Sequence, residues 1–402
     1  MNRIQRRVLG TLFFSIFTSV TGVGIVVPLL PVYAHDLGAS GIYIGLIFGA
    51  FSLSRTFFLP FFGSLSDRKG RKPFIVTGLL SYAVISVAFI FSTNVESLIG
   101  IRFVQGIASA MIMPVVQAYV GDLTPKGREG WVMGLFNMSL MIGLSAGPMI
   151  GGVIKDRFSL QGAFVSMGVL SVVAFGLSLS FLPPTAEEQV VLKRRTPVQW
   201  SKILTDRTIA GLFFFRLTYT ACIGIIWGFL PVFADVEFAI SASAIGTLVA
   251  LGIFVSGIFQ VPMGWAADRF DRKSMVILGG LIVTAAIWAF SHATGFWYMF
   301  YASIGFGIGG GICMPAMMAV AVLWGSRSKA MGSVMALLTV AHSLGLLGGS
   351  LLAGMMMDLF QLRQAFLFGA LSMLAGILVF TVCTWRSDLI RGTATGAPPH
   401  IP

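Results

Sequence analysis

The chain has 402 residues, of which 56% are hydrophobic and only 10% are charged, and its formal net charge is +12. Soluble domains carry about 25% charged residues, so this composition excludes a water-exposed globular fold. It favours transmembrane helices, because an open sheet edge in lipid would leave backbone polar groups unpaired. The alternation of apolar and polar residues that is typical of barrel strands is also absent.

Twelve apolar runs are long enough to cross a bilayer, which takes roughly 20 residues in a helix. In chain order they cover about 8–33, 41–62, 74–92, 97–119, 131–154, 162–182, 209–234, 242–265, 275–292, 296–323, 330–356 and 364–385. The first run follows two arginines, but it is too long for a signal peptide and no small-residue cleavage site follows it. We therefore expect an all-α membrane protein with twelve transmembrane helices.

The distribution of Lys and Arg predicts the orientation. With the N-terminus inside, 21 of the 27 basic residues fall on the cytoplasmic side, whereas three (Lys155, Arg157 and Arg363) fall outside and three lie within spans. This asymmetry satisfies the positive-inside rule. It predicts a multi-pass membrane protein with both termini cytoplasmic. The positive charge is thus a topology signal, and no basic face of a folded domain indicates nucleic acid as a partner.

The chain contains an internal repeat. Two charged segments lie 201 residues apart, Gly63-Ser-Leu-Ser-Asp-Arg-Lys-Gly-Arg-Lys72 and Gly264-Trp-Ala-Ala-Asp-Arg-Phe-Asp-Arg-Lys273. At the same offset Gly106 corresponds to Gly307, Pro114 to Pro315 and Gly147 to Gly348. The repeat predicts an N-terminal six-helix bundle over 1–182, a cytoplasmic linker over 183–208, a C-terminal six-helix bundle over 209–386 and a disordered tail over 387–402.

The first charged segment resembles the signature loop of the major facilitator superfamily, whose members transport solutes. The resemblance implies two pseudo-symmetric six-helix halves with a substrate site between them near mid-membrane. It also implies a conformational latch that holds the cytoplasmic side while the transporter is open outward. In this sequence the latch would comprise Gly63, Asp67, Arg68, Gly70, Arg71 and Asp122.

The two glycines of this segment are expected to allow a close helix approach and a tight turn in a short link. A second copy, with Asp268 and Arg272, is expected to be weaker, because Asp271 replaces the second glycine and Leu323 stands at the position equivalent to Asp122. The alternative is that both segments are ordinary charges that mark a loop.

A second motif, Gly143-Leu-Ser-Ala-Gly-Pro-Met-Ile-Gly-Gly152, resembles the antiporter motif of the drug:proton branch. Gly143, Gly147 and Gly151 are four residues apart, so they line one helix face and admit a neighbouring helix. Pro148 frees a backbone carbonyl and bends the helix. The resemblance, which includes Gly152, implies antiport rather than symport, although small-residue stripes alone are common in membrane helices.

Several polar residues within spans are candidates for the cavity. Arg102-Phe-Val-Gln105-Gly106 matches a third signature of the family. A charge at membrane depth is costly and by default faces the interior or a water-filled cavity. Arg102 either acts on a proton or a substrate, or bonds backbone carbonyls and braces two helices. Candidates without a family motif are Arg55 and Arg216, the latter with Tyr219 and Trp227 on its helix face, and both are also open to a packing role. His342 is a further candidate because an imidazole titrates near neutrality, although a lone helix histidine is more often a packing residue.

All fifteen Asp and Glu residues fall at span ends or in loops. Many proton-coupled exporters of this family carry an acid inside the first span, but this chain has none there before Asp36. Asp36, Asp235 and Glu237 are therefore the acids expected to reach the cavity. Three intramembrane arginines without an embedded acid suit an anionic or zwitterionic solute.

Together with the resemblance, these features predict a secondary active transporter of a bacterial inner membrane. It is expected to export amphipathic small molecules or drugs in exchange for protons by alternating access. The alternative is a carrier for an organic anion or a lipid-like metabolite, in which Arg102 and Arg216 hold the acidic group. We expect no enzyme activity, no metal and no other cofactor, because no metal cluster, nucleophile–base pair or phosphate-binding glycine loop is found. Small-molecule substrate, protons and lipids are the expected partners. A single chain contains both halves and is expected to work as a monomer.

Overall fold

The computed structural model describes residues 3–124, 129–183, 205–328 and 331–385, and in these ranges the chain forms helices and no strands. The first half contains α1 (Arg3–Val26), α2 (Leu29–Asp36), α3 (Gly41–Lys69), α4 (Arg71–Ile90), α5 (Val95–Leu123), α6 (Glu129–Arg157) and α7 (Leu160–Phe181). The second half contains α9 (Arg207–Phe238), α10 (Ala242–Arg269), α11 (Arg272–Ser291), α12 (Phe296–Arg327), α13 (Met331–Leu359) and α14 (Leu362–Cys383).

The described residues contain twelve candidate membrane spans, which confirm the predicted helices. The first span consists of α1 and α2 together, with a break just before Leu29. Pro28 lies at this break, where its ring nitrogen cannot donate a hydrogen bond to the preceding turn. Most of the predicted linker, 183–208, and the predicted tail, 387–402, lie outside the described residues.

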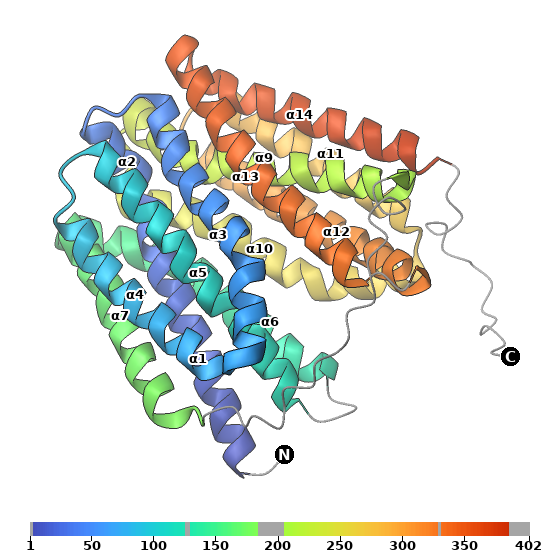
Figure 1. Ribbon diagram of the computed structural model, residues 1–402. Coiled ribbons are helices and arrows are strands. Elements are labelled where there is room, and N and C mark those ends of the chain that lie inside the picture. Colours follow the sequence, from blue (N-terminus) through green and yellow to red (C-terminus); the bar gives the residue numbers. More distant parts are fainter. Residues whose placement is uncertain (1–2, 125–128, 184–204, 329–330, 386–402) are drawn as a thin grey trace, which may run out of the picture.

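The two halves repeat the same helix packing (Figure 1). In the first half α1 packs on α6 and α7, α3 packs on α5, and α4 packs on α5 and α7. In the second half α9 packs on α13 and α14, α10 packs on α12, and α11 packs on α12 and α14. The predicted internal repeat thus corresponds to a repeated set of helix contacts.

Glycines set the close contacts inside each half. On α6, a Cβ atom at Gly147 would lie 2.7 Å from the Cα atom of Gly24 on α1. On α13, a Cβ atom at Gly349 would likewise meet the backbone of Ala221 on α9, whereas the space at Gly348 is open. The structural counterpart of Gly147 is therefore Gly349, and the predicted correspondence with Gly348 is wrong. The offset between the halves is one residue longer in this helix than in the charged segments.

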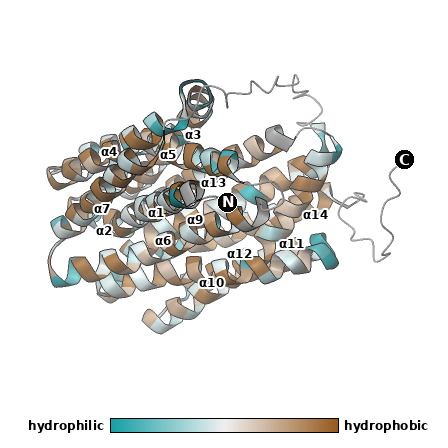
Figure 2. Ribbon diagram, turned by 90° about the horizontal axis from the view of Figure 1, so that it is seen from below, coloured by the Kyte–Doolittle hydropathy of each residue, from teal (hydrophilic) through white to brown (hydrophobic). Residues whose placement is uncertain are grey.

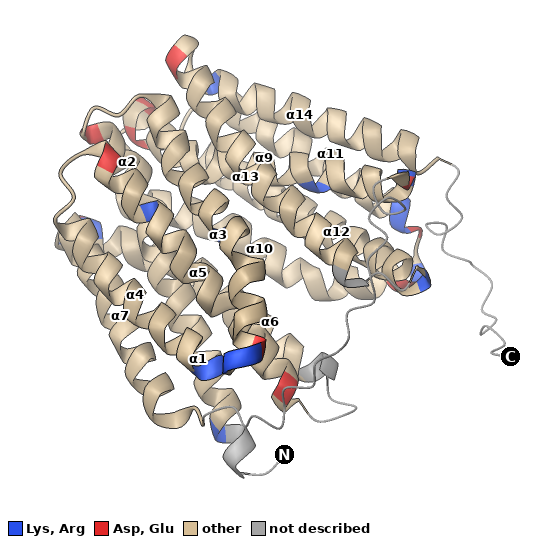
Figure 3. Cartoon of the chain, in the orientation of Figure 1, with Lys and Arg blue, Asp and Glu red and all other residues tan. Residues whose placement is uncertain are grey.

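Charges lie mainly at the two ends of the molecule, and hydrophobic residues cover the length between them (Figures 2 and 3). Large apolar side chains such as Phe57, Val261 and Leu378 are exposed along this length, as expected of a lipid-facing surface. We call the end that carries the links 69–71 and 269–272 the basic end. The acidic end is the opposite one, which carries Asp36, Glu96, Asp156, Asp235, Glu237 and Asp358.

The halves contact each other most closely toward the acidic end. The first turns of α3 pack on the last turns of α13, with Gly41 against Gly354 and Gly45 against Ser350. In the symmetric contact α10 packs on α6, with Gly246 against Pro148. From there the two bundles diverge toward the basic end (Figure 1).

Candidate functional site

The first charged segment is mostly helical rather than a loop. Helix α3 continues through Lys69 and α4 begins at Arg71, so that Gly70 alone links them. The φ angle of Gly70 is +88°, which favours glycine. Gly63, in contrast, has open space at its Cβ position, so the expected close helix approach there is wrong. The helix passes through the segment because no residue before Gly70 breaks it.

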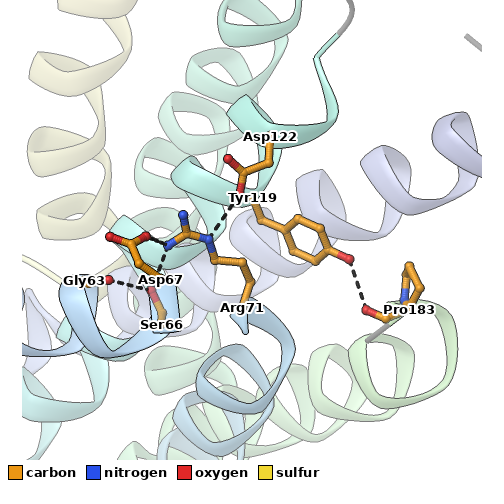
Figure 4. Close-up of polar contacts among 7 residues, drawn as sticks. All are labelled: Gly63, Ser66, Asp67, Arg71, Tyr119, Asp122 and Pro183. Atoms are coloured by element: carbon orange, nitrogen blue, oxygen red, sulfur yellow. Dashed lines mark hydrogen bonds and ion pairs between the residues drawn. The ribbon is translucent and has the colours of Figure 1, made fainter. Parts of the chain in front are cut away.

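Arg71 is the centre of the predicted latch (Figure 4). Its Nη1 atom lies 2.5 Å from Oδ1 of Asp67, and its Nε atom donates to Oδ2 of Asp122 on α5 at 3.2 Å. Nη1 also donates to the hydroxyl of Ser66 at 2.8 Å, and that hydroxyl donates to the carbonyl of Gly63. The predicted Asp67–Arg71–Asp122 contacts thus tie α3, α4 and α5 together. Sequence reasoning did not include Ser66, and Arg68 is exposed.

The second charged segment does not reproduce this network. Its Arg269 lies over the ring of Trp265, 3.8 Å from the centroid. Asp271 caps α11 by accepting hydrogen bonds from the backbone N–H and the hydroxyl of Ser274. In the described part of the chain neither Asp268 nor Arg272 forms an ion pair. In the described residues the second segment thus lacks the ion pairs of the first, as expected from Asp271 in place of the second glycine and Leu323 in place of Asp122.

The glycine stripe of the antiporter motif packs inside the first half. Gly143, Gly147 and Gly151 face the backbone of α1, and the equivalent stripe of α13 faces α9 in the same way. The stripe is therefore a packing feature of both halves. Pro148 and Gly152 instead face the second half, where Gly152 contacts Ala242. In the second half Gly354 stands at the position equivalent to Gly152, but Ser350 stands at the position equivalent to Pro148. The proline is therefore particular to the first half.

A cavity of about 50 Å³ lies between the halves. Its lining is apolar except for one arginine, and consists of Val23, Gly24, Val27, Phe48, Phe51, Arg102, Leu144 and Pro148 from the first half and Trp227, Val249, Ile253 and Leu346 from the second. An apolar lining with few polar groups is typical of small-molecule sites.

Arg102 is 2% exposed and is held inside the first half. Its Nη1 atom donates to Oε1 of Gln105 at 2.7 Å, and its Nε atom donates to the carbonyl of Ile47 on α3 at 3.3 Å. The guanidinium also lies 4.5 Å from the ring centroid of Phe51, within cation–π range. These contacts match the predicted bracing role, because they join α5 to α3. The Nε2 atom of Gln105 is buried and has no hydrogen-bond partner.

A second cationic group lies where the halves begin to separate. The Nη2 atom of Arg216 on α9 is 3.3 Å from Nδ1 of His342 on α13, and its Nη1 atom contacts the sulfur of Met314. Arg55 lies on α3 of the other half, three residues after Ser52. The hydroxyl of Ser52 donates to the carbonyl of Ser343 at 3.0 Å, which places this group next to the interface.

That Arg102 and Arg216 together hold the acidic group of a substrate stays a prediction, and in the structure Arg216 has other neighbours. Arg216 lies with His342 and Arg55, and we call these three residues the cationic cluster. The Nε atom of Arg55 is buried and has no hydrogen-bond partner, and no ion pair to the cluster exists among the described residues.

The remaining predicted residues lie in other places. Trp227 lines the cavity, whereas Tyr219 is buried in the second half and stacks on Phe306. Asp36 is exposed and Asp235 is half-buried at the acidic end. The Oε2 atom of Glu237 lies 2.7 Å from Nη2 of Arg363. None of these acids lines the described cavity.

Two carboxylates that sequence reasoning missed join the halves at the acidic end. Asp156 of α6 accepts hydrogen bonds from the backbone N–H groups of Ala242 and Ser243 at 3.1 and 2.8 Å. Asp358 of α13 accepts from the N–H groups of Gly41 and Ile42 at 2.6 and 3.0 Å. A sequence signal existed, because an aspartate follows a glycine by four residues at this place in both halves, as Gly152–Asp156 and Gly354–Asp358.

Comparison with known proteins places this architecture in a family. The family model of the Major Facilitator Superfamily matches residues 12–236 and 212–399. Multidrug resistance protein 2 of Bacillus subtilis is 27% identical over 93% of this chain and 94% of its own length. Quinolone resistance protein NorA of Staphylococcus aureus is 26% identical over 92% of this chain and 95% of its own length.

The fold agrees with the sequence comparison. The crystal structure of a bacterial homologue of the human lysosomal transporter Spinster superposes with a TM-score of 0.83 at 14% identity, and the match covers 98% of this chain and all of that one. This multi-pass membrane protein belongs to the Major Facilitator Superfamily and resembles its drug:proton antiporter branch.

Proposed function

We propose that the protein exports amphipathic small molecules by alternating access, driven by the proton gradient. The observation that carries this proposal is the apolar cavity between two halves that meet at the acidic end. The efflux relatives support the direction of transport, and the Gly-Pro motif, whose Pro148 lines the cavity, supports antiport. An apolar lining accepts the apolar body of a substrate without a fixed set of polar contacts.

The orientation of the proposed cycle follows from the charges. If the basic end faces the cytoplasm of an inner membrane, contact at the acidic end corresponds to a conformation that takes up substrate from the cytoplasmic side. Export then requires the acidic end to open while the basic end closes. The network around Arg71 would hold α3, α4 and α5 as one rigid unit during this movement.

A second candidate is the export or exchange of organic anions, and the cationic cluster favours it. Arg55, Arg216 and His342 come together from both halves, and the described carboxylates all lie elsewhere. Charged groups at membrane depth are costly unless they are paired. An anionic group of a bound substrate would supply the missing partner. In this arrangement the groups available to carry the coupling proton are the carboxylates at the helix ends and His342.

Proton movement in inside-out vesicles tests both candidates. With the vesicle lumen acidified, a pH-sensitive dye is followed while lipophilic cations and organic anions are added in turn. Proton release on adding cations supports the drug:proton antiporter, and release with anions alone supports the second candidate. No release with either class, from protein that is folded and inserted, contradicts proton-coupled antiport.

A further inference from the structure

The two carboxylates at the acidic end form a reciprocal pair. Asp156 belongs to the first half and binds the N-terminus of α10 in the second, whereas Asp358 belongs to the second half and binds the N-terminus of α3 in the first. Each carboxylate uses both of its oxygens, one for each of two successive backbone N–H groups. Each half therefore donates one carboxylate and receives one.

Helix N-termini give these contacts their strength. The first N–H groups of a helix have no partner within it, and the helix dipole favours a negative charge at that end. Hydrogen bonds from backbone N–H to a carboxylate are charge-assisted and stronger than neutral ones. The side chain of Ser40, the residue before α3, makes no capping hydrogen bond. The carboxylate from the opposite half supplies the cap that the local residue does not.

The backbone around each carboxylate is packed too closely for a larger residue. Gly41 lies against the carbonyl of Gly354, and Gly152 lies against the carbonyl of Ala242. These glycines bring the end of one helix over the start of the other. The contact therefore exists only while the halves are in register at this end, and a separation of the halves breaks all four hydrogen bonds.

We propose that Asp156 and Asp358 together form a clamp that holds the acidic end closed, and that its release is a required step in opening this end during transport. The proposal rests on the alternating access argued above, but its test needs neither substrate nor flux. If the export proposal fails, the result of this test can still be interpreted. If the clamp proposal fails, the export proposal is not affected.

The first experiment measures the distance between the halves at the acidic end. Spin labels are placed at Phe158 and Phe360, which are exposed and follow the two carboxylates by two residues each. Cys383 is replaced by Ser, while Cys222 and Cys313 are buried and stay. In detergent or lipid, D156A/D358A should shift the label distances toward a longer component and raise the open-to-closed ratio at least about tenfold. D156A alone and D358A alone should each raise the open-to-closed ratio less than the double variant does.

Two further variants keep this test decisive. D156N/D358N keeps the shape and one acceptor oxygen of each side chain, so its shift should lie between those of the parent and the alanine variant. D36N is the matched control, because Asp36 is an exposed acidic-end carboxylate without a described contact to the other half, and it should leave the distances unchanged. Unchanged distances in folded, monodisperse D156A/D358A and D156N/D358N would overturn the proposal.

Amide hydrogen exchange distinguishes a clamp from two local caps. In D358N, peptides that contain Gly41 and Ile42 should lose protection, because their acceptor is weakened. If the two contacts open together, peptides that contain Ala242 and Ser243 should lose protection in the same variant. Faster exchange confined to the start of α3 would contradict the reciprocal clamp.

Discussion

The guanidinium of Arg216 faces the imidazole of His342 between α9 and α13, with Nη2 3.3 Å from Nδ1. The guanidinium is a permanent cation and has only donors, so Nδ1 accepts this hydrogen bond while the imidazole is neutral. Arg55 adds a second permanent charge from the opposite half. The group therefore has donor capacity at membrane depth that the described carboxylates do not satisfy, which makes it the place to test for an anionic substrate.

Replacing Arg216 by Gln should weaken the binding of organic anions. A hydrogen bond to a charged group contributes about 1.5–3 kcal/mol, so the dissociation constant should rise roughly tenfold to a hundredfold. Arg216→Lys should retain part of the affinity, because it keeps the charge. Binding of radiolabelled anions to the purified protein measures the effect, with a lipophilic cation as the control ligand. Equal losses for both ligands would point to a packing role.

Replacing Asp67 by Asn should impair transport much more than stability. The carboxylate of Asp67 is half exposed, and exposed ion pairs contribute only about 0–1 kcal/mol, so the melting temperature should change little. Transport should fall more than about tenfold if Arg71 must be held for the helices to move as a unit. Flux and thermal unfolding of the same preparation measure the two effects.

Asp268→Asn is the matched control for this prediction, because Asp268 is the equivalent residue in the second segment and forms no described ion pair. Asp268→Asn should have little effect on flux or on the melting temperature. Unchanged flux in Asp67→Asn would contradict the role of the Arg71 network in holding α3, α4 and α5 as one unit.

The sequence predicted the helices well because lipid leaves the chain few choices. The twelve predicted apolar runs correspond to the twelve candidate spans among the described residues. Asp67 and Arg71 could be expected from one motif, and Asp122 from its place at the end of the fourth span. The prediction was weaker where helices end. The segment after Gly63 was expected to be a loop because it is charged, but Leu, Arg and Lys are good helix formers and the helix continues to Lys69.

Contacts between the halves were the hardest to predict. Asp156 and Asp358 bind backbone N–H groups, and any residue type can supply these, so the partner leaves no mark in the sequence. His342 reaches Arg216 through the packing of α13 on α9 within the second half, whereas Arg55 belongs to the first half and comes near His342 only through the arrangement of the halves. Arg102 was correctly singled out as a residue inside the protein, but its spacing from Gln105 did not show that Arg102 also donates to the carbonyl of Ile47 on α3.

Replacing Gly147 by Ala should destabilise the first half. The new Cβ atom would lie 2.7 Å from the backbone of Gly24, so α6 and α1 would have to move apart. Overpacking of this kind costs about 1–3 kcal/mol, which should lower the thermal unfolding temperature in detergent. Gly348→Ala is the matched control, because its Cβ position has no atom within 4 Å, and it should be neutral. Equal effects of the two substitutions would contradict the packing described for the glycine stripe.

Replacing Arg102 by Lys should reduce stability even though the charge is kept. The guanidinium reaches Gln105, the carbonyl of Ile47 and the ring of Phe51 at the same time. An ammonium group lacks the planar fork that makes this possible, so at least one buried acceptor would lose its partner, at a cost of about 1–3 kcal/mol. Thermal unfolding measures this cost.

Arg55→Lys is the control for Arg102→Lys, because the arginine at position 55 has no described hydrogen bond to lose and should tolerate the change. If Arg102 served only to bind substrate, Arg102→Lys would be as stable as Arg55→Lys and would differ from the parent only in the affinity for substrate. A stability loss confined to Arg102→Lys would instead establish Arg102 as the brace between α5 and α3.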